Sequence, residues 1–417
     1  MTTAEFIREY RERDIRQLAL QANRFPDVDM PYALDQIQGW QIARRKLPKW
    51  AACDGVIFPP HLSMEQCSSE PTAQYKLNLA TEWTCRIESL ELRVENSELS
   101  TQNCRRQQFK TQNSTIKTST RMTDLTGGFG VDFSFTSCAF AAATYVERSE
   151  QLCHIVEHNL PLLGLNNATV VCADAVEYLS TVEPQTMLFL DPARRDEHGA
   201  KTVMLADCTP DVVQLLPKLL EKSRFTMLKL SPMLDWHKAV DDLQGAVREV
   251  HIVSVGGECK ELLLVLSTVV ESELKVYCAD LSTASDTSSL FVYTPGSSAP
   301  VANSKLKTQN SKFVHEPNAS IMKAGCFDEL AAAYGVSPVS RNSHLFLSDE
   351  PVEGFPGQKL RCGARDDDEQ ERAAQGVGRH RESQYSYAQL PPLCRRTAQT
   401  PQNQRRRRRV YLRHNHR

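Results

Sequence analysis

The sequence has no pair of cysteines at C-x-x-C spacing, no N-terminal signal-peptide pattern and no apolar run that approaches twenty residues. Because its 13 cysteines occur singly, zinc ribbons and disulfide-stabilised scaffolds are not expected. A membrane-spanning helix needs about 20 consecutive apolar residues, so we expect no membrane segment. These absences together predict a cytoplasmic protein, since thiols stay reduced in the cytosol.

An excess of either charge is also missing. The chain has 49 Lys and Arg against 51 Asp and Glu, which gives a formal net charge of −2 at pH 7. A polyanionic partner would therefore have to bind a local basic patch. We expect no bound metal, and the sequence says nothing about oligomeric state. At 417 residues the chain is longer than one ordinary core, so two or three domains are expected.

Composition divides the chain into six segments. We expect an N-terminal helical domain at residues 1–91, a polar insertion at 92–120, an α/β domain at 121–270, a connecting segment with a second polar insertion at 271–312, a small α+β domain at 313–357 and a basic tail at 358–417. The first insertion has too few large apolar groups to form a core, which predicts disorder. Both insertions contain KTQNS, at 110–114 and 307–311, which indicates inserted repeat sequence.

Apolar residues at helical spacing predict helices in the first eighty residues. The S-x-x-Q pattern from Ser63 to Gln66 has the form of a capping box and predicts a helix start there. The segment RRKLPKW at 44–50 combines four cations with a Trp, a composition suited to phosphate contact and base stacking. It also fits a solvated helix end above a packed Trp50.

Between residue 121 and about residue 267, apolar strands alternate with helical stretches. The strands are TYVE, TVVCAD, MLFLD and FTMLKLS, and their alternation with helices predicts a parallel sheet covered by helices. The end of this block differs, because only a short turn around Gly256 and Gly257 separates REVHIVSV from KELLLVLS. This spacing predicts an antiparallel hairpin.

A glycine-rich turn follows the first strand of this block. In MTDLTGGFGVDFSF, Asp124 and Thr126 precede Gly127, Gly128 and Gly130. Glycine lets the backbone approach a ligand closely, and the following helix start offers free N–H groups. The G-G-x-G spacing departs from the dinucleotide-binding G-x-G-x-x-G, and with the terminal hairpin it disfavours a nicotinamide-dependent oxidoreductase.

Acidic residues occur at the carboxyl ends of three further strands: Glu147 ends TYVE, Asp174 ends VVCAD and Asp191 ends MLFLD. Open α/β sheets bind ligands at that edge. Glu147 is suitably placed for two ribose hydroxyls, and Asp174, followed by Ala175, for an adenine amino group. Any of these acids could instead cap a helix, and capping is our interpretation of Asp207.

In this order, the motifs resemble class I S-adenosylmethionine-dependent methyltransferases, and more closely the bacterial ones with a C-terminal THUMP-like domain. The central resemblance lies in DLTGGFGVDFSF, YVER, FLDPARRDEHGAKTV, DCTPD, KLSPMLDW and ECKELLLVLS. LDQIQGWQIARRKLP and HLSMEQCSSE extend it to the N-terminal helices, and HEPNASIMKAGCFDELAAAYG, SHLFLSDE and GFPG extend it to Gly357. It implies a Rossmann-like α/β fold, with a mostly parallel seven-stranded sheet and terminal antiparallel hairpin, and a partial THUMP-like α+β domain at 313–357.

The resemblance implies S-adenosyl-L-methionine as the cofactor. Asp124 and the glycine turn would then hold its methionine end, with Glu147 at the ribose and Asp174 and Ala175 at the adenine. The segment D-P-A-R at 191–194 would form the catalytic rim. Its candidate catalytic residues are Asp191, Pro192 and Arg194.

The arginines of this rim favour RNA, either rRNA or tRNA, because a guanidinium can stack on a base and bind a phosphate. D-P-A-R differs from the [D/N]-P-P-[Y/F/W] of exocyclic-amine methyltransferases, and the loop at 229–233 has no cysteine for attack at uracil C5. Arg194 and Arg195 could also form ion pairs with nearby acids. Candidate substrate-binding residues are Arg195, Lys229, Ser231, Asp235 and Trp236, although residues 235–237 equally fit a capped helix start with a packed Trp.

The tail after Gly357 contains five consecutive arginines at 405–409. One interpretation is a basic arm for RNA. Read one nucleotide later, however, possible codons for residues 365–375 give a strand-to-helix sequence like that of the family, so we favour out-of-frame translation. The chain is thus expected to be a cytoplasmic RNA methyltransferase, with a catalytically inactive RNA-binding protein of the same fold as the alternative.

Overall fold

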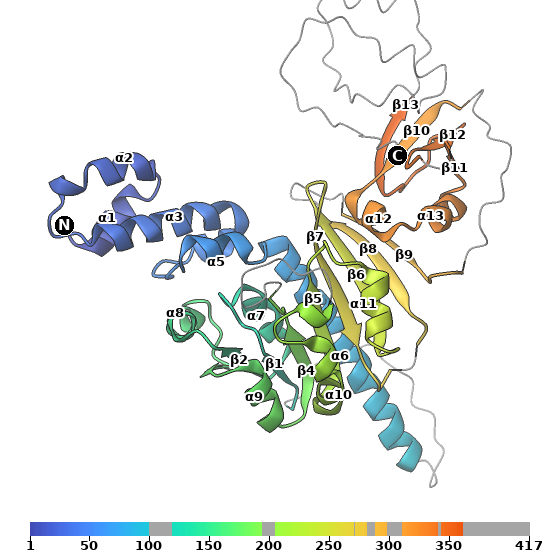
Figure 1. Ribbon diagram of the computed structural model, residues 1–417, viewed down its shortest axis with the longest axis horizontal. Coiled ribbons are helices and arrows are strands. Elements are labelled where there is room, and N and C mark those ends of the chain that lie inside the picture. Colours follow the sequence, from blue (N-terminus) through green and yellow to red (C-terminus); the bar gives the residue numbers. More distant parts are fainter. Residues whose placement is uncertain are drawn as a thin grey trace, which may run out of the picture. The chain divides into compact units, whose positions relative to one another are not determined.

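The computed structural model describes residues 1–99, 119–193, 205–270, 272–281, 288–297, 311–340 and 343–361. The chain divides into two compact units (Figure 1). The first contains Met1–Val255 and Lys260–Leu274, and the second contains Gly256–Cys259 and the chain from Lys275 onward. The basic tail beyond residue 361 lies outside the described residues, as does most of the first polar insertion.

The N-terminal part of the first unit is helical, as predicted. Its elements are α1 (Thr3–Tyr10), α2 (Ile15–Leu20), η1 (Ala22–Arg24), α3 (Met30–Lys46), α4 (Pro48–Ala51), α5 (His61–Gln66) and α6 (Glu70–Leu99). The predicted capping box at Ser63 is wrong, because α5 begins at His61 after Pro60 and has no side-chain cap. Helix α6 continues to Leu99, past the expected domain end at residue 91.

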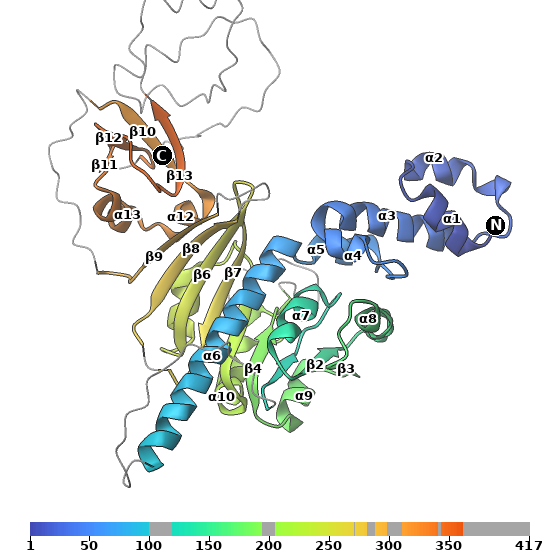
Figure 2. The same ribbon diagram turned by 180° about the vertical axis from the view of Figure 1, so that it is seen from behind.

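Helix α6 joins this helical part to the sheet. It packs beside β4, β5, β6 and α7 (Figure 2). Trp83 on α6 is fully buried, and its ring centroid lies 5.6 Å from that of Phe225 on β5. The indole N–H of Trp83 donates a hydrogen bond of 2.7 Å to Glu249 of β6, so the helix is fixed to the sheet by apolar and polar contacts.

Seven strands of the main sheet lie in the first unit, apart from the first two residues of the last strand: β1 (Arg121–Asp124), β2 (Ala142–Glu147), β3 (Ala168–Cys172), β4 (Gln185–Leu190), β5 (Ser223–Leu230), β6 (Val247–Val255) and β7 (Glu258–Leu266). Their order is β3-β2-β1-β4-β5-β7-β6. Strands β1 to β5 pair in parallel, and β7 pairs antiparallel to β5. The mixed α/β sheet is therefore confirmed; the described residues contribute nine strands to it, so the expected seven-stranded detail is not confirmed.

Helices alternate with the parallel strands. They are α7 (Val131–Thr136), η2 (Ser137–Ala139), α8 (Glu150–Leu162), α9 (Ala175–Thr181), η3 (Leu205–Asp207), α10 (Val212–Lys222) and α11 (Trp236–Asp242). The strands between them are apolar because both faces are covered, and residues 187–190 of β4 are all at most 1% exposed. The capping role expected of Asp207 is wrong, since Asp211 caps α10 and Asp207 ends η3.

The second unit contains β8 (Lys275–Leu281), which pairs antiparallel with β9 (Ser289–Tyr293). It also contains a four-stranded sheet in the order β11-β12-β10-β13. These strands are β10 (Phe313–Pro317), β11 (Ser337–Pro338), β12 (Phe346–Ser348) and β13 (Gly357–Arg361), accompanied by α12 (Ala319–Ala324) and α13 (Phe327–Tyr334). A small core of Val314, Val339, Leu345 and Leu347 lies at this sheet. The expected α+β character of the segment is confirmed.

In the described ranges, no helix combines the length and the apolar character needed to cross a bilayer. The same ranges contain no group of three or more His, Cys, Asp or Glu side chains arranged to hold a metal ion.

Candidate active site

The glycine-rich turn connects β1 to α7, and its shape requires glycine. A Cβ atom at Gly127 would lie 2.1 Å from Cε2 of Tyr145 on β2, so no other residue fits without displacing that ring. Gly128 and Gly130 have φ angles of +55° and +81°, the left-handed region that favours glycine. The Gly127 N–H donates to the carbonyl of Val146 at 2.9 Å, which fixes the turn against β2.

Hydrogen bonds connect this turn to the ends of the neighbouring strands. The Gly128 N–H donates to Oε2 of Glu147 at 3.0 Å, at the end of β2. The backbone N–H of Asp191, which follows β4, donates to Oγ1 of Thr126 at 2.6 Å. The Thr126 N–H in turn donates to Oδ1 of Asp124 at 3.0 Å. The carboxyl ends of β1, β2 and β4 therefore meet around the turn, as the sequence predicted.

Asp124 is almost fully buried, with 1% of its surface exposed. Burial raises the pKa of its carboxyl well above the ordinary value, and the negative charges of Asp132 and Asp191 raise it further. The Thr126 N–H and the Lys229 ammonium oppose this rise. A carboxyl group in such surroundings favours a proton or a positively charged ligand.

Lys229, near the end of β5, lies between two carboxylates. Its Nζ is 2.6 Å from Oδ2 of Asp191 and 3.1 Å from Oδ2 of Asp132. Burial lowers the pKa of Lys229, but these carboxylates outweigh it and raise the pKa well above the ordinary value. The Asp191 side chain remains 40% exposed, whereas that of Lys229 is only 12% exposed. Lys229 thus holds one oxygen of a carboxylate that solvent or substrate can still reach.

Asp132 was not among the residues predicted from the sequence. It is the second residue of α7 and lies buried behind the glycine turn. Burial would raise its pKa, but the ammonium groups of Lys229 and Lys76 lower the pKa to about 2. The only sequence signal was an acid two residues after Gly130, in GGFGVD. Its two lysine partners come from α6 and β5, far away along the chain.

The two residues that the sequence predicted for adenine contact, Asp174 and Ala175, lie at the start of α9. Asp174 is exposed and caps α9, where its Oδ1 accepts from the N–H groups of Val176 at 2.8 Å and Glu177 at 3.2 Å. Ala175 is the first residue of that helix. Asp174 lies two residues after Cys172, and Cys172 on β3 is paired in register with Glu147 on β2. Capping is thus one role of Asp174, and its contact with adenine stays a prediction.

The remaining predicted residues divide into three groups. Pro192 is buried after β4, while Arg194 and Arg195 lie outside the described residues. Ser231 is buried, and its Oγ accepts from the Met233 N–H at 3.2 Å. Asp235 caps α11 by accepting from the His237 N–H at 2.9 Å, and Trp236 is only 3% exposed. The capped and packed arrangement is therefore present at 235–237, and substrate contacts there stay predictions.

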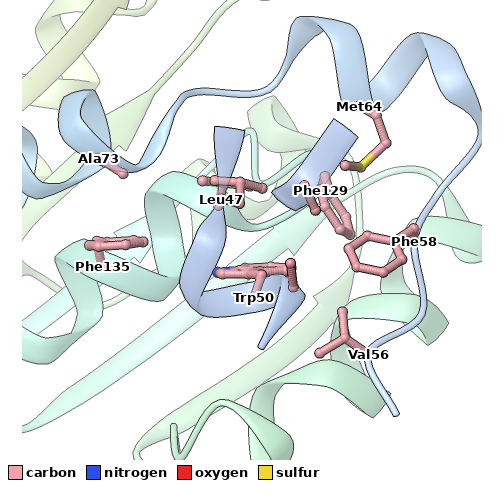
Figure 3. Close-up of a cluster of buried hydrophobic side chains, with 11 residues drawn as sticks. Leu47, Trp50, Val56, Phe58, Met64, Ala73, Phe129 and Phe135 are labelled. Carbon is pink, nitrogen blue, oxygen red and sulfur yellow. The ribbon is translucent and has the colours of Figure 1, made fainter. Parts of the chain in front are cut away.

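The basic segment at 44–50 supports the turn from outside the sheet. Trp50 is 3% exposed and packs against Phe129 of the glycine turn (Figure 3). The Lys46 ammonium donates to the carbonyls of Met64 at 3.0 Å and Glu65 at 2.7 Å. The packed interpretation of Trp50 is thus confirmed. It leaves no indole face for base stacking.

Comparison with known proteins agrees with this fold. A family model described as a ferredoxin-like domain matches residues 313–356, whereas the THUMP-like assignment is not confirmed. No curated protein matches the chain. The crystal structure of a candidate methyltransferase from Porphyromonas gingivalis W83 is similar with a TM-score of 0.68 and 25% identity, covering 95% of this chain and 90% of that one. This neighbour supports a class I methyltransferase.

Two further solved structures match a smaller part. The SAM-dependent methyltransferase of Agrobacterium tumefaciens is 18% identical with a TM-score of 0.28, over 36% of this chain and 56% of that one. An rRNA methylase of Streptococcus thermophilus is 14% identical with a TM-score of 0.28, over 36% of this chain and 86% of that one. Both likenesses are too limited to carry an argument about this chain.

Proposed function

We propose that this protein is an S-adenosyl-L-methionine-dependent methyltransferase that acts on RNA, either rRNA or tRNA. The observation that carries the proposal is the meeting of three acidic strand ends at the glycine turn. The Glu147 carboxylate accepts from the Gly128 N–H, and the backbone N–H of Asp191 donates to the Thr126 hydroxyl. The backbone N–H of Thr126 donates in turn to the Asp124 carboxylate. In open α/β sheets this edge is where nucleotide ligands bind.

The residues at this edge fit the proposed cofactor. S-adenosyl-L-methionine carries a sulfonium and an ammonium, and the buried Asp124 carboxyl, close to the charges of Asp132 and Asp191, favours a cationic ligand. Gly127 and Gly128 let the backbone approach the ligand closely. Glu147 would bind the ribose hydroxyls, and Asp174 with Ala175 would lie at the adenine.

When bound, the cofactor supplies an electrophilic methyl group for an in-line displacement. The protein then has to align the nucleophile and stabilise the charge that develops on it. Asp191 suits this task, because Lys229 fixes its Oδ2 at 2.6 Å while 40% of its side chain stays exposed. Its carboxylate can accept a hydrogen bond from the N–H or O–H of a substrate nucleophile and so orient it. Pro192 restricts the backbone directly after this carboxylate.

RNA as the substrate rests on the residues that follow Asp191. Arg194 and Arg195 offer planar cations able to stack on a base and to bind a phosphate through two hydrogen bonds. Lys229 adds a further positive charge beside the carboxylate.

The proposal can be tested in two steps. Calorimetry with S-adenosylhomocysteine should show binding to the folded protein, and its absence would remove the cofactor from the proposal. Transfer of tritiated methyl from the cofactor to total RNA should then label RNA. Asp191→Ala should abolish labelling, whereas Asp54→Ala, at a side chain that is 88% exposed, should leave it unchanged. Cofactor binding and RNA binding without labelling would instead identify a catalytically inactive RNA-binding protein.

A further inference from the structure

Lys76 is a fully buried lysine in the middle of the first unit, with none of its surface exposed. Its Nζ lies 2.6 Å from both carboxylate oxygens of Glu261 on β7 and 3.1 Å from Oδ1 of Asp132 on α7. Removing such charges from water costs several kcal/mol per ion before any pairing. Apolar side chains of similar volume usually replace buried ion pairs without loss of stability, so stability alone does not explain this cluster.

The cluster is continuous with the proposed catalytic edge. Asp132 lies between two ammonium groups, with Oδ1 facing Lys76 and Oδ2 facing Lys229, each at 3.1 Å. Lys229 then contacts Oδ2 of Asp191 at 2.6 Å. Ser68, just before α6, donates to Oδ2 of Asp132 at 2.8 Å and helps to fix its orientation. Alternating charges thus lead from α6 through α7 and β5 to the exposed Asp191.

We propose that Lys76 is a positioning residue of the active site, which by neutralising Asp132 and Glu261 keeps the Lys229 ammonium on Asp191. This inference rests on the proposed methyltransferase function. Without Lys76, two buried carboxylates would lose their cation, and Lys229 is the nearest remaining positive charge for Asp132. Lys229 would move toward Asp132 and release the Asp191 carboxylate.

The charge states of the cluster support this direction. Burial raises the pKa of Glu261, whereas Lys229 and Lys76 together outweigh burial at Asp132 and lower its pKa to about 2. Asp132 is therefore the firmly ionised group that competes with Asp191 for Lys229. Lys76 offsets the attraction of Asp132 for Lys229, because it lies at Oδ1 of Asp132 whereas Lys229 lies at Oδ2.

The test uses the full-length protein with three variants. Lys76→Met removes the cation, and Lys76→Met with Asp132→Asn removes one charge of each sign, so the net charge of the cluster is restored and the carboxylate that would draw Lys229 away is gone. Lys218→Met is the matched control, because Lys218 is exposed on α10 and its ammonium donates to Oγ of Ser180 at 2.9 Å. Single-turnover methyl transfer, S-adenosylhomocysteine affinity and the ¹³C resonance of the Asp191 carboxyl, assigned with Asp191→Asn, are measured for each.

Lys76→Met should slow single-turnover transfer by about tenfold or more while the affinity for S-adenosylhomocysteine changes less than about threefold. The Asp191 resonance should move in this variant. Both rate and resonance should return toward wild type in the double variant and stay unchanged in Lys218→Met. A wild-type rate in Lys76→Met, or a double variant as slow as the single one, would overturn the positioning role.

The resonance does not depend on catalysis, so it separates this inference from the proposed function. If wild-type protein labels no RNA, the proposed function fails, yet movement of the Asp191 resonance in Lys76→Met still supports the link. Should Lys76→Met fail to fold, Glu261→Gln tests the same link. Lys76 would then bind Asp132 alone, Lys229 would move toward Asp191 and the resonance should shift. An unmoved Asp191 resonance in that variant refutes the link.

Discussion

The ring of Trp50 lies against the ring of Phe129, with 4.8 Å between their centroids. Trp50 belongs to α4, whereas Phe129 stands between Gly128 and Gly130 in the proposed cofactor-binding turn. Both residues are at most 4% exposed, in a cluster that also holds Leu47, Phe58 and Met64 (Figure 3). The N-terminal helices therefore support the turn from the side away from the sheet.

Trp50→Ala should lower both stability and cofactor affinity. Loss of a buried Trp side chain costs about 3–5 kcal/mol, and the cavity would leave Phe129 without its main partner. We expect S-adenosylhomocysteine to bind about tenfold more weakly to the folded variant, as measured by calorimetry. Phe6→Ala removes an equally buried ring from a separate cluster and should destabilise the protein without changing affinity. Equal affinity in the two variants would show that Trp50 does not support the turn.

Gly127→Ala should disrupt the turn by direct collision. The new Cβ would lie 2.1 Å from Tyr145, and overpacking of this kind costs about 1–3 kcal/mol. Cofactor affinity should fall by about tenfold or more, because the turn must move away from β2. Gly164→Ala is the control: its φ of +77° strains the backbone when alanine is introduced, but no atom lies within 4 Å of the added Cβ, so no collision occurs. It should lower the midpoint of thermal unfolding while leaving affinity intact.

Asp124→Asn should stabilise the unliganded protein and abolish cofactor binding. The raised pKa means that the folded protein holds the Asp124 proton at pH values where the unfolded chain releases it, so stability falls as pH rises above about 4. Asparagine removes this penalty and can still accept from the Thr126 N–H. We expect a gain of about 1–2 kcal/mol at pH 7 in urea unfolding. A destabilised Asp124→Asn variant would show that the carboxylate is well accommodated in its ionised form.

Asp132 should affect the pH dependence of stability in the direction opposite to that of Asp124. Its pKa is lowered to about 2 in the folded protein, so its stabilisation is complete above the unfolded value near 4 and is lost as pH falls through about 2. The free energy of unfolding of wild type should exceed that of Asp132→Asn by roughly 2 kcal/mol at pH 6. This difference should shrink steadily between pH 4 and pH 2. A constant difference over that interval would mean that Asp132 titrates alike in both states.

Much of the fold followed from local pattern. Apolar runs that alternate with helical stretches indicated the parallel strands and their helices, and the expected start of the α/β domain at residue 121 coincides with β1. Errors occurred where a local motif had competing positions. Asp207 and Asp211 both precede α10, and only the later one lies at the helix start; at α5 the helix begins two residues before Ser63. The pattern also missed two strands, because β8 and β9 lie in the segment at 271–312, which was expected to be a connection with a polar insertion.

For the site, the glycine turn and the acids at the ends of neighbouring strands could be predicted from the residue pattern, since parallel strands must bring their carboxyl ends to one edge. Which groups surround that edge became known only from the folded chain. Lys76 meets Glu261 across 185 residues of chain, and Lys229 meets Asp132 across 97. No local spacing records such pairs, because the free energy of a buried charge depends on partners that only folding brings within reach.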